Sequence, residues 1–187
     1  YPSLRTAEAK AGILPYLGRV DEAIALLKEQ NGTAAERRDL ATTLSDLDAL
    51  AGRKNEGLKR LDDLLSERPG DPDLLNAKCW YEGTWNLHHE DLQTLCTEAV
   101  EKADFSPPVL DSRAMGYYRL GRFADALKDL NAALSASPTQ TPTLFMRGIV
   151  RREMGDREGD SDIREALARQ PSLERYFARF GIATNPR

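Results

Sequence analysis

Apolar side chains recur along the chain at the three- to four-residue spacing of one helix face. Ala114, Tyr117 and Leu120 mark one such face, and a second series runs from Phe123 to Leu134. The glycine between the two series suits a helix end, because glycine adopts the left-handed conformation there at little cost. No stretch of useful length alternates apolar and polar residues as a half-buried strand would. The pattern predicts helix pairs joined by tight turns, and therefore an all-α fold.

Two independent markers indicate that this helix pair repeats about every 34 residues. An apolar residue precedes a glycine at Gly18, Gly52, Gly121 and Gly155, whose spacings are 34, 69 and 34 residues. The middle spacing leaves room for one repeat without its turn glycine. A capping residue precedes a proline at Asp71-Pro72, Ser106-Pro107 and Thr141-Pro142, each pair 35 residues from the next. Such a side chain can bond free amides of the first turn, and proline fits the next position, so one helix should begin in each period.

Residues 107–140 resemble a tetratricopeptide repeat (TPR) at nearly every diagnostic position. These positions are Ala114, Tyr117, Leu120-Gly121, Phe123, Ala126, Leu130, Ala133 and Pro138. The resemblance implies a right-handed α-solenoid superhelix of about five helix-turn-helix units with a C-terminal capping helix. We expect one TPR domain over residues 1–187, with approximate repeats at 4–37, 38–70, 71–106, 107–140 and 141–171 and a cap at 172–187.

The other repeats depart from the pattern in ways that predict local differences. Pro15 should kink or end the first helix early, since it removes a hydrogen bond and its ring clashes with the preceding turn. The third repeat lacks its turn glycine and should have a longer polar turn near Trp85-Asn86. Trp80, Tyr81 and Trp85 are the densest aromatic cluster, and we expect them to fill a wider gap between helices, with an interface hot spot as the alternative.

Composition narrows the classes of protein that the chain could be. The 187 residues are 41% hydrophobic and 30% charged, with a net charge of −4. This balance argues against nucleic-acid binding, and no apolar run approaches the roughly 18 residues of a membrane span. We expect a soluble protein, cytoplasmic or periplasmic. Because the chain opens at Tyr1 without Met or a signal region, we interpret it as a fragment or a processed chain.

The TPR resemblance also implies a binding site, because in this family the first helices of successive repeats line a concave groove that holds a peptide or partner helix. Many of the corresponding residues are apolar, and exposed apolar patches usually mark interaction sites. The alternative is that neighbouring repeats or the cap cover part of them. Some members of this family use Lys and Asn at set groove positions to bind the C-terminal carboxylate of a chaperone. Thr42, Asp46 and residues of the predicted site named next occupy those positions here, so we do not expect this kind of binding. The predicted partner-binding residues are Leu75, Cys79, Glu82, Asp111, Met115, Tyr118, Phe145, Ile149 and Arg152.

The remaining reactive side chains give weaker evidence of a functional site than the groove residues. His88 and His89 would point about 100° apart on a helix and could not easily share a metal ion, so we expect no metal site. Cys79 and Cys96 lie on the two helices of one predicted pair and could approach each other, but we expect two small buried thiols. There is no phosphate-binding glycine loop and no nucleophile elbow. We therefore expect that the chain is not an enzyme and that it binds no cofactor.

A basic helix face in the fifth repeat has two interpretations. Arg147, Arg151 and Arg152 lie near several acidic residues in sequence, which favours exposed ion pairs worth about 0–1 kcal/mol each. An anionic ligand site is the alternative. The acidic residues are Asp125, Asp129, Asp156, Asp160 and Asp162.

We predict a protein–protein interaction scaffold that binds a peptide or helix of a partner in the concave groove. The alternative is a C-terminal accessory TPR segment of a larger bacterial protein, docking intramolecularly. The ending from Leu173 to Ile182 is similar to tails of bacterial proteins in which such repeats follow a transglutaminase-like domain, which would favour the cell envelope. A third hypothesis is weak self-association through the irregular first repeat, giving a monomer or weak homodimer.

Overall fold

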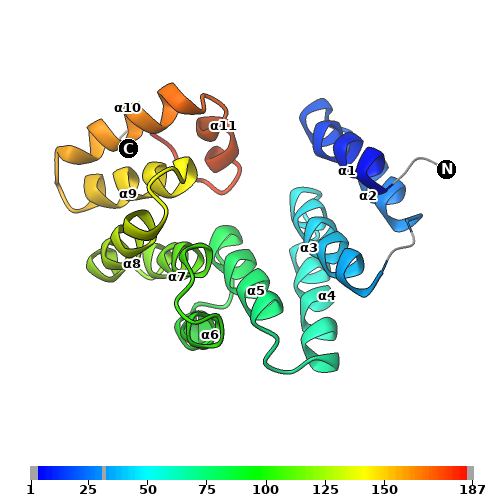
Figure 1. Cartoon of the computed structure of the whole chain (residues 1–187). Coiled ribbons are helices and arrows are strands. Elements are labelled where there is room, and N and C mark those ends of the chain that lie inside the picture. The colour runs from blue at the N-terminus through cyan, green and yellow to red at the C-terminus, as the bar shows by residue number, and fades with distance from the viewer. Residues whose placement is uncertain (1–3, 31–32, 185–187) are drawn as a thin grey trace. The chain divides into compact units, whose positions relative to one another are not determined.

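The computed structural model describes residues 4–30 and 33–184, and within these ranges it contains helices and no strands. The helices are α1 (Leu4–Ile13), a 3-10 turn η1 (Leu14–Leu17), α2 (Val20–Lys28), α3 (Ala34–Leu50), α4 (Lys54–Glu67), α5 (Pro72–Trp85), α6 (His89–Lys102), α7 (Pro107–Arg119), α8 (Phe123–Ala136), α9 (Thr141–Glu153), α10 (Glu158–Arg169) and α11 (Leu173–Ala178). Helices that are consecutive in the chain pack against one another from α1 to α4 and from α6 to α11 (Figure 1). This arrangement confirms the predicted all-α class.

The chain divides into two compact units. Unit 1 is Tyr1–Tyr81 and unit 2 is Glu82–Arg187, so the boundary falls inside α5. Unit 1 contains α1 to α4 and most of α5, whereas unit 2 contains the end of α5 and α6 to α11. The expected division of residues 1–187 into five repeats and a cap stays a prediction.

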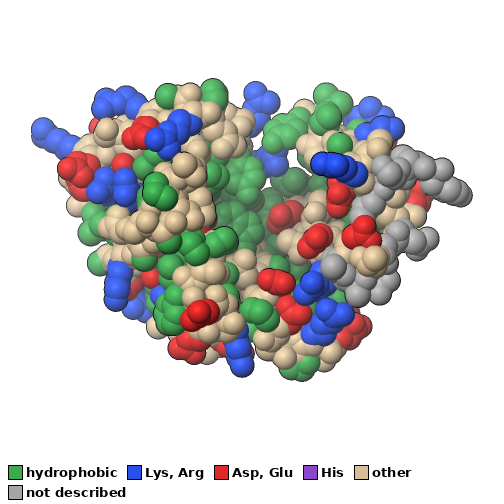
Figure 2. All heavy atoms as spheres, viewed as in Figure 1, with side chains coloured by type: hydrophobic (Ala, Val, Ile, Leu, Met, Phe, Trp, Pro, Cys, Tyr) green, Lys and Arg blue, Asp and Glu red, His purple; other side chains and the backbone are tan. Residues whose placement is uncertain are grey.

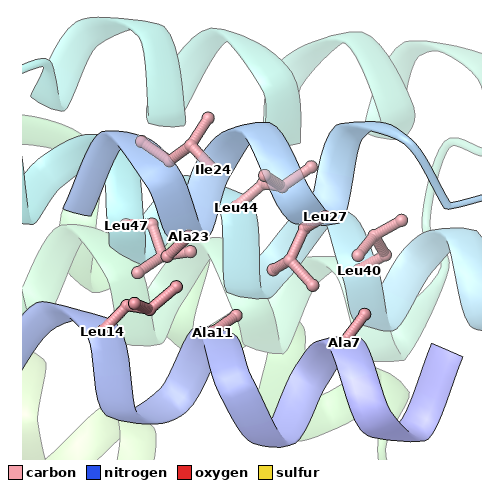
Figure 3. Packing of buried hydrophobic residues seen from close by; sticks show 9 residues of the cluster. All are labelled: Ala7, Ala11, Leu14, Ala23, Ile24, Leu27, Leu40, Leu44 and Leu47. Carbon is pink, nitrogen blue, oxygen red and sulfur yellow. The ribbon is translucent and has the colours of Figure 1, made fainter. Parts of the chain in front are cut away.

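The first repeat is irregular in the way that Pro15 predicts. Helix α1 ends at Ile13, and Pro15 lies in the 3-10 turn that follows, which confirms the early helix end. The core of this part of unit 1 combines alanines of α1 and α2 with leucines of α3, and the small side chains let the helix backbones approach (Figure 3). The cluster consists of Ala7, Ala11, Leu14, Ala23, Ile24, Leu27, Leu40, Leu44 and Leu47.

The turn glycines adopt the left-handed conformation that the repeat pattern predicts. Gly18, Gly52, Gly121 and Gly155 have φ values of 72°, 82°, 69° and 77°. Each lies between the two helices of a pair, where a residue with a Cβ would be strained. Since α5 and α6 have no glycine between them, Asn86 and His88 take positive φ values of 59° and 46° instead. The expected longer turn in the third repeat was wrong, because residues 86–88 form a turn of the same length as residues 120–122 between α7 and α8.

The capping predictions are right for one helix start of three. The Asp71 side chain accepts hydrogen bonds from the amides of Asp73 and Leu74, at 3.1 and 3.2 Å. Ser106 makes no such bond, and Thr141 is already the first residue of α9. The prolines at these two starts do lie in the first turn, where the missing N–H costs nothing. Proline position therefore marks both helix starts, but the expected side-chain caps at Ser106 and Thr141 were wrong.

In unit 2 the two helices of each pair approach closely where the sequence has small residues. Ala114 of α7 and Ala126 of α8 are both buried. A Cβ added at Gly148 of α9 would lie 2.6 Å from the Ile163 side chain and 2.8 Å from the Gly159 carbonyl oxygen of α10. Only a residue without a side chain fits at Gly148 at this separation.

Candidate functional site

The predicted partner-binding residues that belong to unit 2 lie on the first helices of its pairs. We call this surface, made by the end of α5 with α7 and α9, the α7–α9 face. Met115, Phe145, Ile149 and Glu82 are buried, Asp111 and Tyr118 are partly buried, and Arg152 is exposed. Most of the predicted apolar strip is therefore covered in the folded chain.

The C-terminal segment, residues 173–184, contributes to this cover. The Phe177 ring of α11 stacks on Phe145 of α9, with ring centroids 4.8 Å apart and an angle of 9° between the planes. Phe180 meets the Trp85 ring edge-on at 5.0 Å. The segment thus lies on the α7–α9 face as well as beside α10, which is the second helix of the fifth pair (Figure 1). The sequence predicted a cap here but not its place on the first helices.

Arg119 is a functional candidate that the sequence analysis missed. Its guanidinium donates to the carbonyl oxygens of Gly83 at 2.9 Å, Thr84 at 2.8 Å and Phe180 at 2.6 Å. Burial lowers the pKa of Arg119. The sequence did offer one indication of its role: Arg119 directly follows Tyr118, which the repeat pattern places in the groove. Arg119 joins the end of α5 to the C-terminal segment.

Asp111 carries a polar atom that the fold leaves unsatisfied. Its Oδ1 atom is closed off from solvent and has no hydrogen-bond partner. Burial raises the pKa of Asp111 from 3.8 to about 6, and a hydrogen bond with the Thr143 side chain partly opposes this rise. Because a buried polar atom without a partner is costly, its presence on a predicted binding surface is consistent with a ligand that supplies a donor.

Two predicted site residues, Leu75 and Cys79, belong to unit 1 and are buried there. Cys79 also corrects a prediction. Both cysteines of the chain are disulfide-bonded, so the expectation of two free thiols was wrong, although each side chain is buried as expected. A disulfide-bonded, fully buried side chain cannot contact a partner directly.

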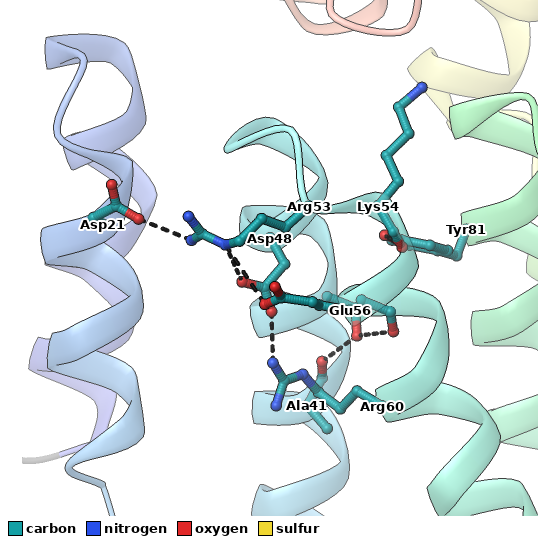
Figure 4. Close-up of polar contacts among 10 residues, drawn as sticks. Asp21, Ala41, Asp48, Arg53, Lys54, Glu56, Arg60 and Tyr81 are labelled. Carbon is teal, nitrogen blue, oxygen red and sulfur yellow. Dashed lines mark hydrogen bonds and ion pairs between the residues drawn. The ribbon is translucent and has the colours of Figure 1, made fainter.

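The aromatic cluster near the end of α5 is largely internal. Tyr81 and Trp85 are buried, and the Tyr81 hydroxyl donates to the Lys54 carbonyl oxygen at 2.8 Å (Figure 4). Trp80 is partly buried. This supports the expected packing role for Tyr81 and Trp85.

The basic face of the fifth repeat is an ion-pair network. Arg147 binds both carboxylate oxygens of Asp162, at 2.7 and 2.8 Å, and Arg151 contacts the same carboxylate at 2.8 Å. Arg152 pairs with Asp160 at 2.5 Å. Figure 2 shows basic and acidic side chains interspersed over the visible face, as paired charges require. The expected ion pairs are therefore present, but the expectation that they are exposed was wrong for Arg147 and Arg151, whose shared partner Asp162 is buried.

Unit 1 has a comparable buried charge. Asp48 is 1% exposed and lies between Arg53, at 3.3 Å, and Arg60, at 2.5 Å (Figure 4). Arg53 also reaches Asp21 of α2 at 2.8 Å. These contacts tie α2, α3 and α4 together, so we assign them a structural role.

Unit 1 also presents exposed apolar side chains at its irregular first repeat. Ile13 and Leu17 are each 61% exposed, and a cleft of about 480 Å³ between α1 and α2 is lined by Ile13, Leu26 and charged residues such as Arg19 and Glu22. The expected self-association would use this surface, and it stays a prediction.

Two further classes of site do not occur in the described part of the chain. No helix there is both long and apolar enough to cross a membrane. Nor do those residues bring together three or more His, Cys, Asp or Glu side chains in a way that could hold a metal ion. His89 instead shares a 2.7 Å hydrogen bond with Asn86 in the turn before α6.

Comparisons with known proteins agree with this architecture. No protein-family model and no curated protein matches the chain. A solved structure of a thermophilic TPR protein from Thermus thermophilus is similar over 95% of this chain and 98% of that chain, with a TM-score of 0.71 and 18% identity. The chain has a TPR-like fold. MamA structures designated MSR-1 and AMB-1 give TM-scores of 0.55 and 0.56 at 17% and 18% identity, covering 89% and 91% of this chain and 97% and 98% of theirs. The predicted TPR-like α-solenoid is confirmed.

Proposed function

We propose that the chain is a protein-interaction scaffold whose α7–α9 face binds a peptide or short helix of a partner protein. The observation that carries the proposal is the way a peptide segment of the chain itself lies on this face. Its aromatic side chains contact Phe145 and Trp85, and one of its carbonyl groups accepts a hydrogen bond from Arg119. Aromatic anchors and arginine are the side chains that dominate binding energy at protein interfaces.

The buried Oδ1 atom of Asp111 supports the same assignment. A bound segment with a donor, such as a lysine or a free amide, would satisfy this atom where binding also opens the face, because the atom is closed off from solvent in the folded chain. The TPR-like fold adds support from architecture, although fold by itself does not define function.

The test is capture of partners from a cell extract, followed by affinity measurement with the purified partner. Tyr118→Ala should weaken binding about tenfold, the loss expected for one interface aromatic. Tyr16→Ala is the matched control, because Tyr16 lies in unit 1 and is half exposed. Phe145→Glu is a poor probe, since Phe145 is fully buried and the change would place a charge in the core. Equal affinity of the Tyr118→Ala variant and the unaltered chain would contradict the proposal.

A second candidate is an accessory segment of a larger envelope protein, with the α7–α9 face docking another part of that protein. The disulfide-bonded state of both cysteines favours it, because disulfides persist in oxidising compartments and are rare in the cytosol. Maleimide labelling of the protein purified without reductant checks this state by intact mass. We expect no label before reduction and one on each cysteine afterwards. Labelling without reductant would remove the support for this candidate.

A further inference from the structure

The segment that covers the α7–α9 face is too short to be stable by itself. Helix α11 spans Leu173–Ala178, fewer than two turns, and ends in a turn with Gly181 at a φ of 72°. Isolated helices of this length do not persist in water. The segment therefore keeps its conformation because of what it contacts.

Those contacts resemble the contacts of a bound peptide more than those of a repeat helix. Phe177 and Phe180, three residues apart, reach Phe145 and Trp85 respectively. Tyr176 packs edge-on against both phenylalanines, at 5.1 and 5.2 Å. Phe177 lies in α11 and Phe180 in the turn that follows it, and both rings pack on the α7–α9 face as the anchors of a bound peptide do.

Two polar contacts of the segment with the rest of unit 2 are made by its main chain. Arg119 donates to the carbonyl oxygen of Phe180, and Arg152 donates to that of Thr184. A carbonyl group is present in any peptide, so these two bonds do not require the sequence of this particular segment. A foreign segment with the same aromatic spacing could accept both bonds.

The connection to the rest of the chain allows the segment to be exchanged. Helix α10 ends at Arg169, and a short turn with an exposed Pro171 leads to Leu173, which is buried. The aromatic residues lie beyond Leu173. They can therefore leave the face by a change in this turn while α7 to α10 stay packed.

We propose that residues 173–184 are a self-ligand that closes the α7–α9 face, and that the partner displaces it with a short helix and turn that carry two aromatic side chains three residues apart. The inference rests on the proposed function and adds the chemistry of the partner and an autoinhibited resting state. Phe145 is buried in that resting state under the Phe177 ring.

The experiment uses a fluorescent peptide that copies residues 172–184, titrated into the full chain and into its Phe177→Ala/Phe180→Ala variant. We expect the variant to bind the peptide at least about ten times more tightly, because its own segment no longer competes. A control peptide with the same two phenylalanines replaced by alanine should bind neither chain. Equal affinity for the two chains, or no binding to a variant that circular dichroism shows to be folded, would overturn the proposal.

Hydrogen exchange on the unaltered chain provides an independent test if the variant does not fold. The amides of Phe180, Gly181 and Ile182 bond to carbonyl groups of the same segment. If the segment opens alone, they should exchange at least about ten times faster than protected amides of α9. Exchange at the rate of α9 would show that the segment is an integral part of the core, and would refute the proposal.

The two proposals can fail separately. Peptide binding to the open variant without any partner whose affinity depends on Tyr118 would support the self-ligand and contradict the proposed scaffold. Conversely, a Tyr118-dependent partner that binds the unaltered chain and the open variant equally would support the scaffold and overturn the self-ligand.

Discussion

Asp111→Asn tests whether the α7–α9 face holds a carboxylate in an unfavourable environment. Burial raises the pKa of Asp111 to about 6 in the folded chain, against 3.8 for the ordinary group. The folded state therefore holds the proton more tightly than the unfolded state. The contribution of Asp111 to the free energy of unfolding is therefore highest at low pH and is lost as the pH rises through about 6. A carboxylate whose pKa is lowered by folding has the opposite dependence.

The size of the effect follows from the two pKa values. They differ by about two units, and each unit corresponds to about 1.4 kcal/mol, so deprotonation costs the fold up to about 3 kcal/mol at neutral pH. The asparagine amide of the variant cannot titrate. We expect the stability of the unaltered chain relative to the Asp111→Asn variant to fall by about 1–3 kcal/mol between about pH 4 and pH 7.

Urea unfolding of both proteins, followed by far-ultraviolet circular dichroism at several pH values, gives this difference. Taking the difference cancels the titration of every other group, and any constant effect of the amide shifts the curve without changing its slope. A difference that does not vary with pH would refute the reasoning, because Asp111 would then titrate at its ordinary value. A difference that rises with pH would also refute it.

Three further predictions concern the fold and use thermal or urea unfolding. Asp48→Ala should destabilise the chain by about 1–4 kcal/mol because it leaves Arg60 without its buried partner. Asp21→Ala removes a side chain that is 82% exposed and should cost less than about 1 kcal/mol, so equal losses for the two variants would contradict this ranking. Gly148→Ala should cost about 1–3 kcal/mol, since its Cβ would overlap the backbone of α10, and a neutral result would show that the two helices can separate freely. Asp71→Ala should cost about 1 kcal/mol and Ser106→Ala only a few tenths, because only the aspartate caps its helix; a larger loss at Ser106 would contradict the observed capping.

The fold was predictable because each repeat signals its own turns. A glycine that must adopt a positive φ is a local requirement, visible without knowledge of neighbouring helices, and all four predicted turn glycines meet it. Pro15 acts locally too, and α1 ends where it predicts. Side-chain caps were less predictable. Whether Ser106 bonds a free amide depends on a rotamer that the sequence does not specify.

Charge pairing shows a signal that was present in the sequence and not used. Arg113 binds both carboxylate oxygens of Asp129, and Arg147 makes the same contact with Asp162 one repeat later. The two arginines are 34 residues apart and the two aspartates 33. Grouping Arg147 with Arg151 and Arg152 as one basic face missed this periodicity. A charge pair that recurs with the repeat joins the two helices of a pair and needs no ligand.

The binding residues were less predictable than the helices, because repeat position fixes which face a residue occupies but not what covers it. Phe145 lies on the first helix of its pair, as predicted, and is nevertheless fully buried under Phe177. That cover comes from a segment outside the repeat pattern. Its place on the first helices depends on long-range contacts, such as the one between Arg119 and Phe180, which no local pattern contains.

A closed face changes how affinities for this chain should be interpreted. If the C-terminal segment must leave before a partner binds, the apparent affinity equals the intrinsic affinity reduced by the fraction of open molecules. A partner without two correctly spaced aromatic residues would have to compensate for the lost contacts of Phe177 and Phe180 with other interactions. Closure therefore adds selectivity to the two hydrogen bonds from Arg119 and Arg152, which by themselves discriminate little between sequences because they are made to main-chain carbonyl groups.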